Sequence, residues 1–277
     1  MGEFRSAIAP LKTALALEPS NAQAATLLGM AYFGAGDYRH AVEPLRSVAS
    51  ADPTNSTLQY VLAESLLWSG QYERVLELFA KIEREDPESV AGHMLLGEAL
   101  DGLDRTSQAI EEFASAARIA PHQPNVHFSL GYLLWKQRKF DQAEEEFRTE
   151  LQNDPAHARS LAYLGDVYFR RRDFESSERL LLQALKLEPN IRIAYVDLGA
   201  IHGSEKQFEK AVRELNKAIQ LDPAQVDAHY RLAATYQAMG RNQEAAEQRE
   251  KVKTLQQTKE LELLHKISGP PPAPPIE

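Results

Sequence analysis

Residues 192–225, RIAYVDLGAIHGSEKQFEKAVRELNKAIQLDPAQ, contain one complete copy of a motif that recurs along the chain. The copy closes on an acidic residue and a proline, Asp222-Pro223, and this proline has six counterparts at intervals of 34 residues. The counterparts are Pro19, Pro53, Pro87, Pro121, Pro155 and Pro189. Because proline lacks an amide hydrogen and cannot continue a helix, each one predicts a helix end. A 34-residue period is typical of stacked helix pairs.

Aligned at this period, the chain holds seven full repeats with small and large side chains at fixed positions. The repeats span residues 22–55, 56–89, 90–123, 124–157, 158–191, 192–225 and 226–259. The seventh position is leucine and the eighth is glycine or alanine, as in Leu96-Gly97. The twentieth position is mostly alanine, and in most repeats a large Leu or Phe follows four residues later, as in Ala109 and Phe113. We expect these small and large side chains to let the two helices of a repeat interlock.

This pattern resembles the tetratricopeptide repeat family, whose motif is W-x2-L-G-x2-Y…A-x3-F…P at the same period. The resemblance covers Gly2 to about Lys259 and departs from the motif mainly at its first, aromatic position. It implies an all-α, right-handed superhelical solenoid of antiparallel helix pairs, A and B, in which the A helices line a concave groove. Physical reasoning favours the same fold, because one helix pair cannot bury its apolar face alone and must stack on neighbours.

The composition excludes several functional classes. The 277 residues contain no cysteine, which removes disulfides, thiolate nucleophiles and Cys-ligated metal sites. A net charge of −9 argues against general binding to nucleic acid, which needs a basic surface. No stretch is long and apolar enough for direct membrane insertion. We expect a soluble protein with no cofactor, and its residues do not distinguish cytoplasm from periplasm.

The N-terminal end carries half a repeat. Residues 1–21 match only a B helix, with an apolar stripe that includes Phe4, Ile8 and Leu11. Without its A helix this stripe is expected to be partly exposed, which soluble monomers tend to avoid. Two hypotheses follow: an upstream segment is missing from this chain, or the chain self-associates through its N-terminal end.

The C-terminal end continues past the last repeat. From Asn242 onward the pattern stays helical with no proline stop, so residues 260–277 are expected to hold the end of an extended capping helix and a Pro-rich tail, SGPPPAPPIE. The leucines of this helix, including Leu261 and Leu264, either pack back on the solenoid, which we favour, or form a coiled coil with another chain. We interpret the tail as a flexible linker in preference to a PxxP ligand.

The resemblance also implies which side chains face the groove: those at the second, fifth, sixth, ninth, twelfth and thirteenth positions of a repeat. In the first repeats these positions carry many apolar and aromatic groups, and exposed apolar strips usually mark contact sites. The candidate groove residues are Leu27, Met30, Tyr60, Glu64, Trp68, Met94, Glu98, Phe128, Tyr132, Trp135, Tyr163, Asp166 and Arg170. The structural alternative is that curvature buries part of this strip between neighbouring A helices.

Other groove positions have simpler interpretations. Tyr230 occupies a position at which aromatic residues are common in the family, and we expect it to support the groove wall. Asp166 and Arg170 lie four residues apart on one helix and are interpreted as a solvated ion pair. Asp197 and Arg231 also occupy groove positions.

Charge is distributed unevenly along the chain. Residues 1–123 hold 9 basic and 17 acidic side chains, a net charge of −8, whereas the whole chain carries −9. A region this acidic would attract a basic or neutral segment of a partner.

Catalysis and metal binding have little support in the residues. The chain contains no phosphate-binding glycine loop, HExxH, GxSxG or paired-carboxylate motif. His93, His127 and His229 share the fourth position of their repeats, but equivalent positions of stacked helices lie about 10 Å apart, too far to share one ion. The chain also lacks the residues of two binding modes known in the family, a clamp for terminal carboxylates and an asparagine ladder.

We therefore interpret the chain as a non-catalytic scaffold that binds a protein or peptide partner in its groove. The expected aromatic anchors are Trp68, Phe128, Tyr132 and Trp135. Two alternatives stay open: an accessory region of a larger enzyme or of an envelope or secretion assembly, and a module that self-assembles through its N-terminal helix.

Overall fold

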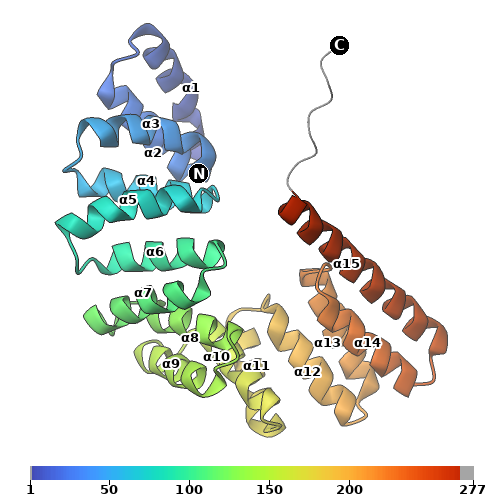
Figure 1. Ribbon diagram of the computed structural model, residues 1–277. Coiled ribbons are helices and arrows are strands. Elements are labelled where there is room, and N and C mark those ends of the chain that lie inside the picture. The colour runs from blue at the N-terminus through green and yellow to red at the C-terminus, as the bar shows by residue number, and fades with distance from the viewer. Residues whose placement is uncertain (1, 269–277) are drawn as a thin grey trace, which may run out of the picture. The chain divides into compact units, whose positions relative to one another are not determined.

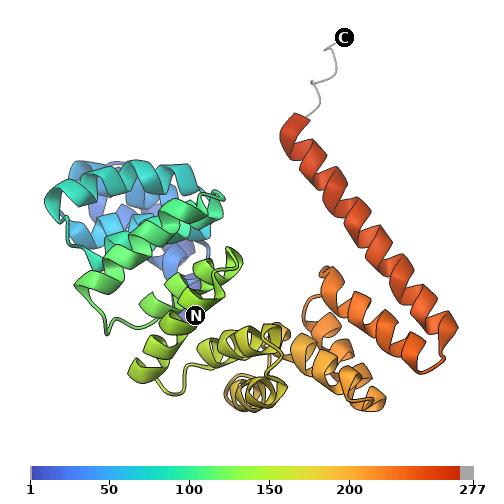
Figure 2. The same ribbon diagram turned by 60° about the horizontal axis from the view of Figure 1, so that its bottom comes forward.

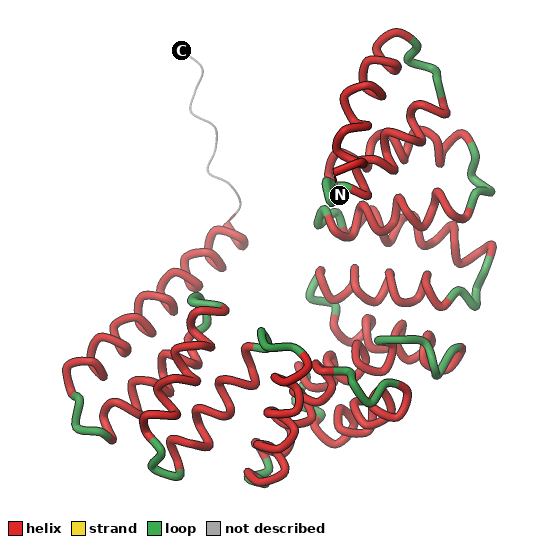
Figure 3. The backbone as a smooth tube through the Cα atoms, turned by 180° about the vertical axis from the view of Figure 1, so that it is seen from behind, coloured by secondary structure: helices red, strands yellow, loops and turns green. Residues whose placement is uncertain are grey.

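A computed structural model describes residues 2–268 and, among these, the side chains of all but residues 81–85 and 265–268. The described residues form α-helices joined by short turns and contain no strand (Figure 1, Figure 3). The helices are α1 (Gly2–Leu17), α2 (Ala22–Gly34), α3 (Tyr38–Ala51), α4 (Ser56–Trp68), α5 (Tyr72–Glu85), α6 (Val90–Gly102), α7 (Thr106–Ile119), α8 (Val126–Lys136), α9 (Phe140–Asn153), α10 (Ala158–Arg170), α11 (Phe174–Leu187), α12 (Arg192–Ser204), α13 (Phe208–Leu221), α14 (Val226–Ala238) and α15 (Asn242–Ser268). The predicted all-α solenoid of helix pairs is confirmed.

The chain divides into two compact units, Met1–Glu146 and Phe147–Glu277. The even-numbered helices are the A helices, and the odd-numbered helices are the B helices. Consecutive A helices pack on one another within each unit: α2, α4 and α6 in the N-terminal unit, and α10, α12 and α14 in the C-terminal unit (Figure 2). Each of these helices also packs against the B helix of its own repeat. This stacking gives each repeat the neighbours that it needs to bury its apolar side chains.

Most A helices begin at the first position of their aligned repeat. Asn21, Asn55 and Ser89 precede three of these helices, and each side chain accepts a hydrogen bond from an amide in the first turn. The exception is α8, which begins at Val126, two positions into its repeat at 124–157. Its start is delayed because the preceding residue, Asn125, has a left-handed backbone with φ 67°.

The predicted interlock of small and large side chains is confirmed in the core. Phe113 and Leu215 are 2% and 0% exposed, and each packs over a glycine of the A helix. A Cβ atom at Gly97 would lie 2.6 Å from the Phe113 ring, and one at Gly199 would lie 2.6 Å from Leu215. Glycine at the eighth position therefore allows the B helix to approach closely and leaves no void between the helices.

The histidine at the fourth position of three repeats contacts both the B helix of its own repeat and the turn that precedes the repeat. His127 is buried; its Nδ1 lies 2.6 Å from Glu146 Oε2, and its Nε2 lies 3.0 Å from the carbonyl oxygen of Pro121. His93 and His229 make the equivalent two contacts in their own repeats. These contacts satisfy a backbone carbonyl that follows a helix end, so the three histidines hold repeats together.

The turn between helices A and B places one residue of each repeat in the left-handed region of the backbone. The equivalent positions are Gly36, Gly70, Asp104, Arg138, Arg172, Lys206 and Gly240, all with φ between 58° and 76°. Residues with a Cβ atom are strained in this region, whereas glycine is not. The backbone is therefore strained at Asp104, Arg138, Arg172 and Lys206, and replacing any of these residues with glycine would relieve the strain at that position.

Replacing Lys206, at φ 62°, with glycine is expected to raise the free energy of unfolding by about 1 kcal/mol, because the left-handed strain disappears. Urea denaturation followed by circular dichroism measures the change. Arg213→Gly, in the middle of α13, is the matched control and is expected to lower stability by about 1 kcal/mol. A loss of stability in Lys206→Gly would contradict the strain argument.

The N-terminal helix is packed on one side only. α1 contains no buried residue, and it contacts α2. Phe4, which is 48% exposed, lies with its ring over Gly34, where an added Cβ atom would meet the ring at 2.7 Å. The expected partial exposure of the apolar stripe on this helix is confirmed.

The helix predicted from Asn242 onward is confirmed, since α15 extends to Ser268. The expectation that its leucines pack back on the solenoid is wrong for Leu261 and Leu264, which are 58% and 54% exposed. The reason is length: α15 has 27 residues, whereas α14, on which it packs, has 13. The interpretation of the Pro-rich tail concerns residues 269–277, which lie outside the described residues.

Candidate partner-binding surfaces

The N-terminal unit exposes large apolar side chains on two neighbouring A helices. Trp68, at the end of α4, is 62% exposed, and Leu27 and Met30 on α2 are 49% and 36% exposed. The Tyr38 ring lies beside Trp68, with the two centroids 6.3 Å apart. We call Leu27, Met30 and Trp68 the apolar surface. Exposed apolar side chains gathered on neighbouring helices are typical of an interaction site.

Two carboxylates, Glu64 and Glu98, occupy the ninth positions of α4 and α6 in the same unit. Both side chains are half-buried, and burial raises the pKa of Glu64. Burial also raises the pKa of Glu98, and the negative charge of Glu64 raises it further. The two carboxylates therefore repel each other, and a cation bound near both would be stabilised.

Tyr60 on α4 and Met94 on α6 contribute to packing between the A helices of the N-terminal unit. Both side chains are half-buried. The Tyr60 hydroxyl forms a hydrogen bond with Ser89 Oγ, at the start of α6, and this bond fixes the ring between two repeats. For these two residues the burial supports the structural alternative.

Three aromatic rings form a column on α8. Phe128 stacks on Tyr132 with centroids 6.2 Å apart, and Tyr132 stacks on Trp135 at 6.0 Å. Lys136 Nζ lies 5.8 Å from the Tyr132 centroid and 2.6 Å from a carboxylate oxygen of Asp101 on α6. All three rings are half-buried, so the column contributes to packing and still presents ring surface to solvent.

Of the three predicted residues of the C-terminal unit, Arg170 is exposed, whereas Tyr163 and Asp166 are less accessible than a groove lining would be. Tyr163 is half-buried and stacks on the buried Phe147 at 5.9 Å. Asp166 is 1% exposed and accepts a hydrogen bond of 2.5 Å from Nε of Arg170. The ion pair is present, but the expectation that it is solvated is wrong for Asp166, because α12 packs against α10 and covers this carboxylate.

Packing of α12 on α10 also places Asp197 next to Asp166. Asp197 is 2% exposed, and burial raises its pKa well above the ordinary value for aspartate. The charge of Asp166 and a hydrogen bond between the two side chains act in the same direction, whereas Arg231 and Arg170 oppose it. The raised pKa disfavours the charged form of Asp197, and a protonated Asp197 can donate this hydrogen bond to Asp166.

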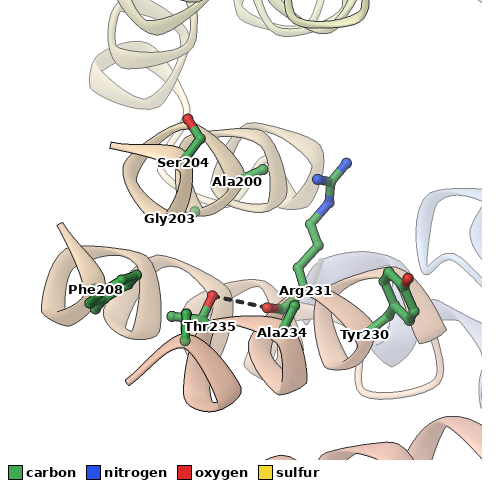
Figure 4. Close-up of a pocket in the computed structure, with 10 residues that line it drawn as sticks. Ala200, Gly203, Ser204, Phe208, Tyr230, Arg231, Ala234 and Thr235 are labelled. Carbon is green, nitrogen blue, oxygen red and sulfur yellow. Dashed lines mark hydrogen bonds between the residues drawn. The ribbon is translucent and has the colours of Figure 1, made fainter. Parts of the chain in front are cut away.

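A hollow of about 250 Å³ lies between α12 and α14 in the same unit. Figure 4 shows small side chains of α12 on one side of it and those of α14 on the other. The small lining residues are Gly199, Ala200, Gly203, Ser204, Ala234, Thr235 and Ala238. Thr235 is already satisfied, because its Oγ1 donates to the carbonyl oxygen of Arg231 at 2.9 Å. Part of the lining is therefore close to the backbone, and the larger side chains of Phe208, Tyr230 and Arg231 complete it.

A second hollow, of about 340 Å³, lies between α14 and α15. Val226, Val252 and Gln256 contribute to its lining, and both hollows include Tyr230 and Arg231. The expectation that Tyr230 supports the wall is wrong, because the side chain is 69% exposed. The sequence placed Tyr230 and Arg231 at groove positions but did not select them as partner-binding residues. The run of small side chains on α12 and α14 was the signal that could have revealed the hollow.

Comparison with known families identifies the class of protein. Models described as "Tetratricopeptide repeat" match residues 1–56 and 128–190 in one case and residues 32–99 and 66–133 in another. A model described as "TPR repeat" matches residues 204–240. The chain belongs to the tetratricopeptide repeat family, and the resemblance found in the sequence is confirmed.

Solved structures show the same fold. The chain is similar to a chain of the APC/C hetero-tetramer Cut9-Hcn1, with a TM-score of 0.70, 16% identity, and coverage of 91% of this chain and 50% of that one. It therefore spans half the length of that relative. It is also similar to pilF of Pseudomonas aeruginosa, with a TM-score of 0.64, 17% identity, and coverage of 75% and 94%. A comparison with curated proteins found no match.

The described part of the chain contains neither a candidate membrane span nor a candidate metal-binding cluster. None of the helices within residues 2–268 combines the length and apolar character needed to cross a membrane. Among the described side chains, no group of three or more His, Cys, Asp or Glu residues is placed to hold a metal ion.

Proposed function

We propose that the chain is a non-catalytic scaffold whose N-terminal A helices bind a segment of a partner protein. The observation that carries the proposal is the apolar surface, in which Trp68, Leu27 and Met30 stay exposed on adjacent A helices. Tryptophan contributes strongly to binding when a partner covers it, because a large apolar area leaves water. Membership of a repeat family built for stacking and extended surfaces supports the same role.

The charges near the apolar surface favour a partner segment that carries both apolar and basic side chains. Glu64 and Trp68 lie four residues apart on α4 and therefore share one face of that helix. A Lys or Arg placed between Glu64 and Glu98 would relieve their repulsion. The net charge of −8 on residues 1–123 would also speed the approach of a basic segment.

The double variant Trp68→Ala with Tyr132→Ala is expected to abolish pull-down of the main partner, because it removes the exposed anchor and opens the aromatic column. The measurement is affinity capture with crosslinking from the native host, after circular dichroism has shown that the helix content is intact. The matched control is Leu182→Ala with Leu187→Ala on the B helix α11, where the side chains are 51% and 47% exposed. Equal capture by wild type and the double variant would refute this assignment.

A further inference from the structure

The C-terminal unit has a second candidate surface, which is independent of the apolar surface. Its centre is a pair of neighbouring side chains on α14, Tyr230 and Arg231, which contribute to the hollows on both sides of this helix. Tyr230 is 69% exposed, and Arg231 is half-buried. In Figure 4 the Arg231 side chain rises from α14 beside α12, whereas Tyr230 lies farther along α14.

Arg231 differs from the arginines around it in how its guanidinium is used. Arg192 donates to both carboxylate oxygens of Asp227, at 2.7 and 3.1 Å, and Arg170 donates to Asp166. The Arg231 guanidinium instead lies 5.0 Å from the centroid of the Phe169 ring and donates no hydrogen bond to any residue in the described part of the chain. A guanidinium placed over an aromatic face is held there by a cation–π interaction, and its five N–H donors, which lie in the plane of the guanidinium, stay available to a ligand.

The acidic groups around Arg231 do not neutralise it. Asp227 is already held by both terminal nitrogens of Arg192. Asp197 is buried on α12, where loss of water raises its pKa and so disfavours its charged form. Asp166 is engaged by Arg170. Arg231 influences Asp197 and Asp227 through its charge. Within the described residues, however, its guanidinium forms no direct ion pair, so its donors are available to an anionic ligand.

The shape of the surface favours an extended chain as the ligand. Gly203, Ala200 and Ala234 line part of the first hollow with small side chains, between the larger Phe208, Tyr230 and Arg231. A peptide backbone or a small side chain can therefore approach the helices closely in that part. The second hollow offers Val226 and Val252 beside Tyr230, which suits an apolar side chain. The two hollows lie on opposite sides of α14, so one segment that crosses this helix would enter both.

We propose that this surface binds an extended segment of a partner protein that places an Asp or Glu side-chain carboxylate on Arg231 and an apolar side chain against Tyr230. A carboxylate matches the fork of the guanidinium and makes two parallel hydrogen bonds. The preference is for one negative charge, because a doubly charged phosphate on Arg231 would be repelled more strongly by the nearby carboxylate of Asp227. The ligand class is thus opposite in charge to the one proposed for the N-terminal unit.

The test uses the full chain and an array of ten-residue peptides that share an alanine and serine background with one leucine. At one scanned position the peptides carry Glu, Gln, Lys or phosphoserine. We expect the wild-type chain to retain Glu peptides in preference to their Gln and Lys counterparts. Arg231→Ala is expected to weaken binding of the selected Glu peptide by about tenfold to a hundredfold, because it removes the two charged hydrogen bonds between the guanidinium and the carboxylate.

Two controls separate the proposal from loss of folding and from the N-terminal surface. Arg213→Ala removes an exposed arginine from the B helix α13 and should leave binding of the Glu peptide unchanged. Trp68→Ala with Tyr132→Ala should also leave it unchanged, so failure of one site does not imply failure of the other. Equal binding of Glu and Gln peptides, a preference for phosphoserine, no retention of any Glu peptide, or wild-type affinity in Arg231→Ala would each overturn the proposal.

Discussion

Replacing Phe113 with alanine is expected to lower the free energy of unfolding by about 3–5 kcal/mol, the usual cost of removing a buried aromatic side chain. Phe113 is 2% exposed and fills the space that Gly97 leaves on the A helix of the same repeat. The variant loses the apolar transfer energy of the ring and also leaves a cavity, because the two helices are held apart by their other contacts.

The loss of stability in Phe113→Ala should be largest in the repeat that contains Phe113, formed by α6 and α7. In a stack of repeats each one is stabilised by its nearest neighbours, so α6 and α7 should lose protection from amide hydrogen exchange before more distant helices. Chemical denaturation gives the total loss, and hydrogen exchange gives its location. The control is Tyr230→Ala, which removes an aromatic ring that is 69% exposed and should change stability by no more than about 0.5 kcal/mol. A similar small loss in Phe113→Ala would show that the interlock does not stabilise the fold.

Asp197 is expected to cause a pH-linked change in stability, because its pKa is raised well above the ordinary value by burial and by the charge of Asp166. A group whose pKa is higher in the folded than in the unfolded chain binds its proton more tightly when folded. Its contribution to stability is complete below the unfolded pKa of about 4 and is lost as the pH rises through the folded pKa.

The variant Asp197→Asn tests this sign. Asparagine cannot ionise, so the variant should gain stability relative to wild type as the pH rises from about 4 toward and through the raised pKa of Asp197. Urea denaturation at a series of pH values measures the difference between the two proteins, in which the contributions of other titrating groups largely cancel.

A control of opposite sign is available at Asp173. A hydrogen bond from Ser176 lowers the pKa of this exposed carboxylate, and the side chain caps α11. Asp173→Asn keeps a capping group but removes the charge, so it should lose stability relative to wild type as the pH rises through the lowered pKa. If Asp197→Asn and wild type change in parallel from pH 4 to 8, the buried carboxyl pair does not exist in solution.

The sequence contained enough information to place the helices and the core. The prolines that follow the B helices and the leucine and glycine positions of the A helices recur at one period. The helix boundaries predicted for one repeat are therefore supported by the same pattern in the others. The pairing of Gly97 with Phe113 was predictable for the same reason, because both residues belong to one repeat and their spacing fixes their relative position.

The candidate sites were only partly predictable. A repeat position fixes the direction in which a side chain points, and this was sufficient for Trp68, which no neighbouring element covers. It was not sufficient for Asp166, whose burial depends on a residue of the next A helix, Asp197. Tyr230 was misjudged for the converse reason, since the neighbours that could have covered it are glycine and alanine.

For this protein the sequence by itself determined the period, the helix boundaries to within a few residues, and the contacts inside each repeat, because these depend on local backbone chemistry and on residues close together in the chain. Only the tertiary structure decided which groove positions are exposed, that Asp166 and Asp197 are buried next to each other, and where α14 is flanked by hollows. Those features depend on how side chains about 34 residues apart meet across two stacked repeats, and the size and charge of each partner vary from one repeat to the next.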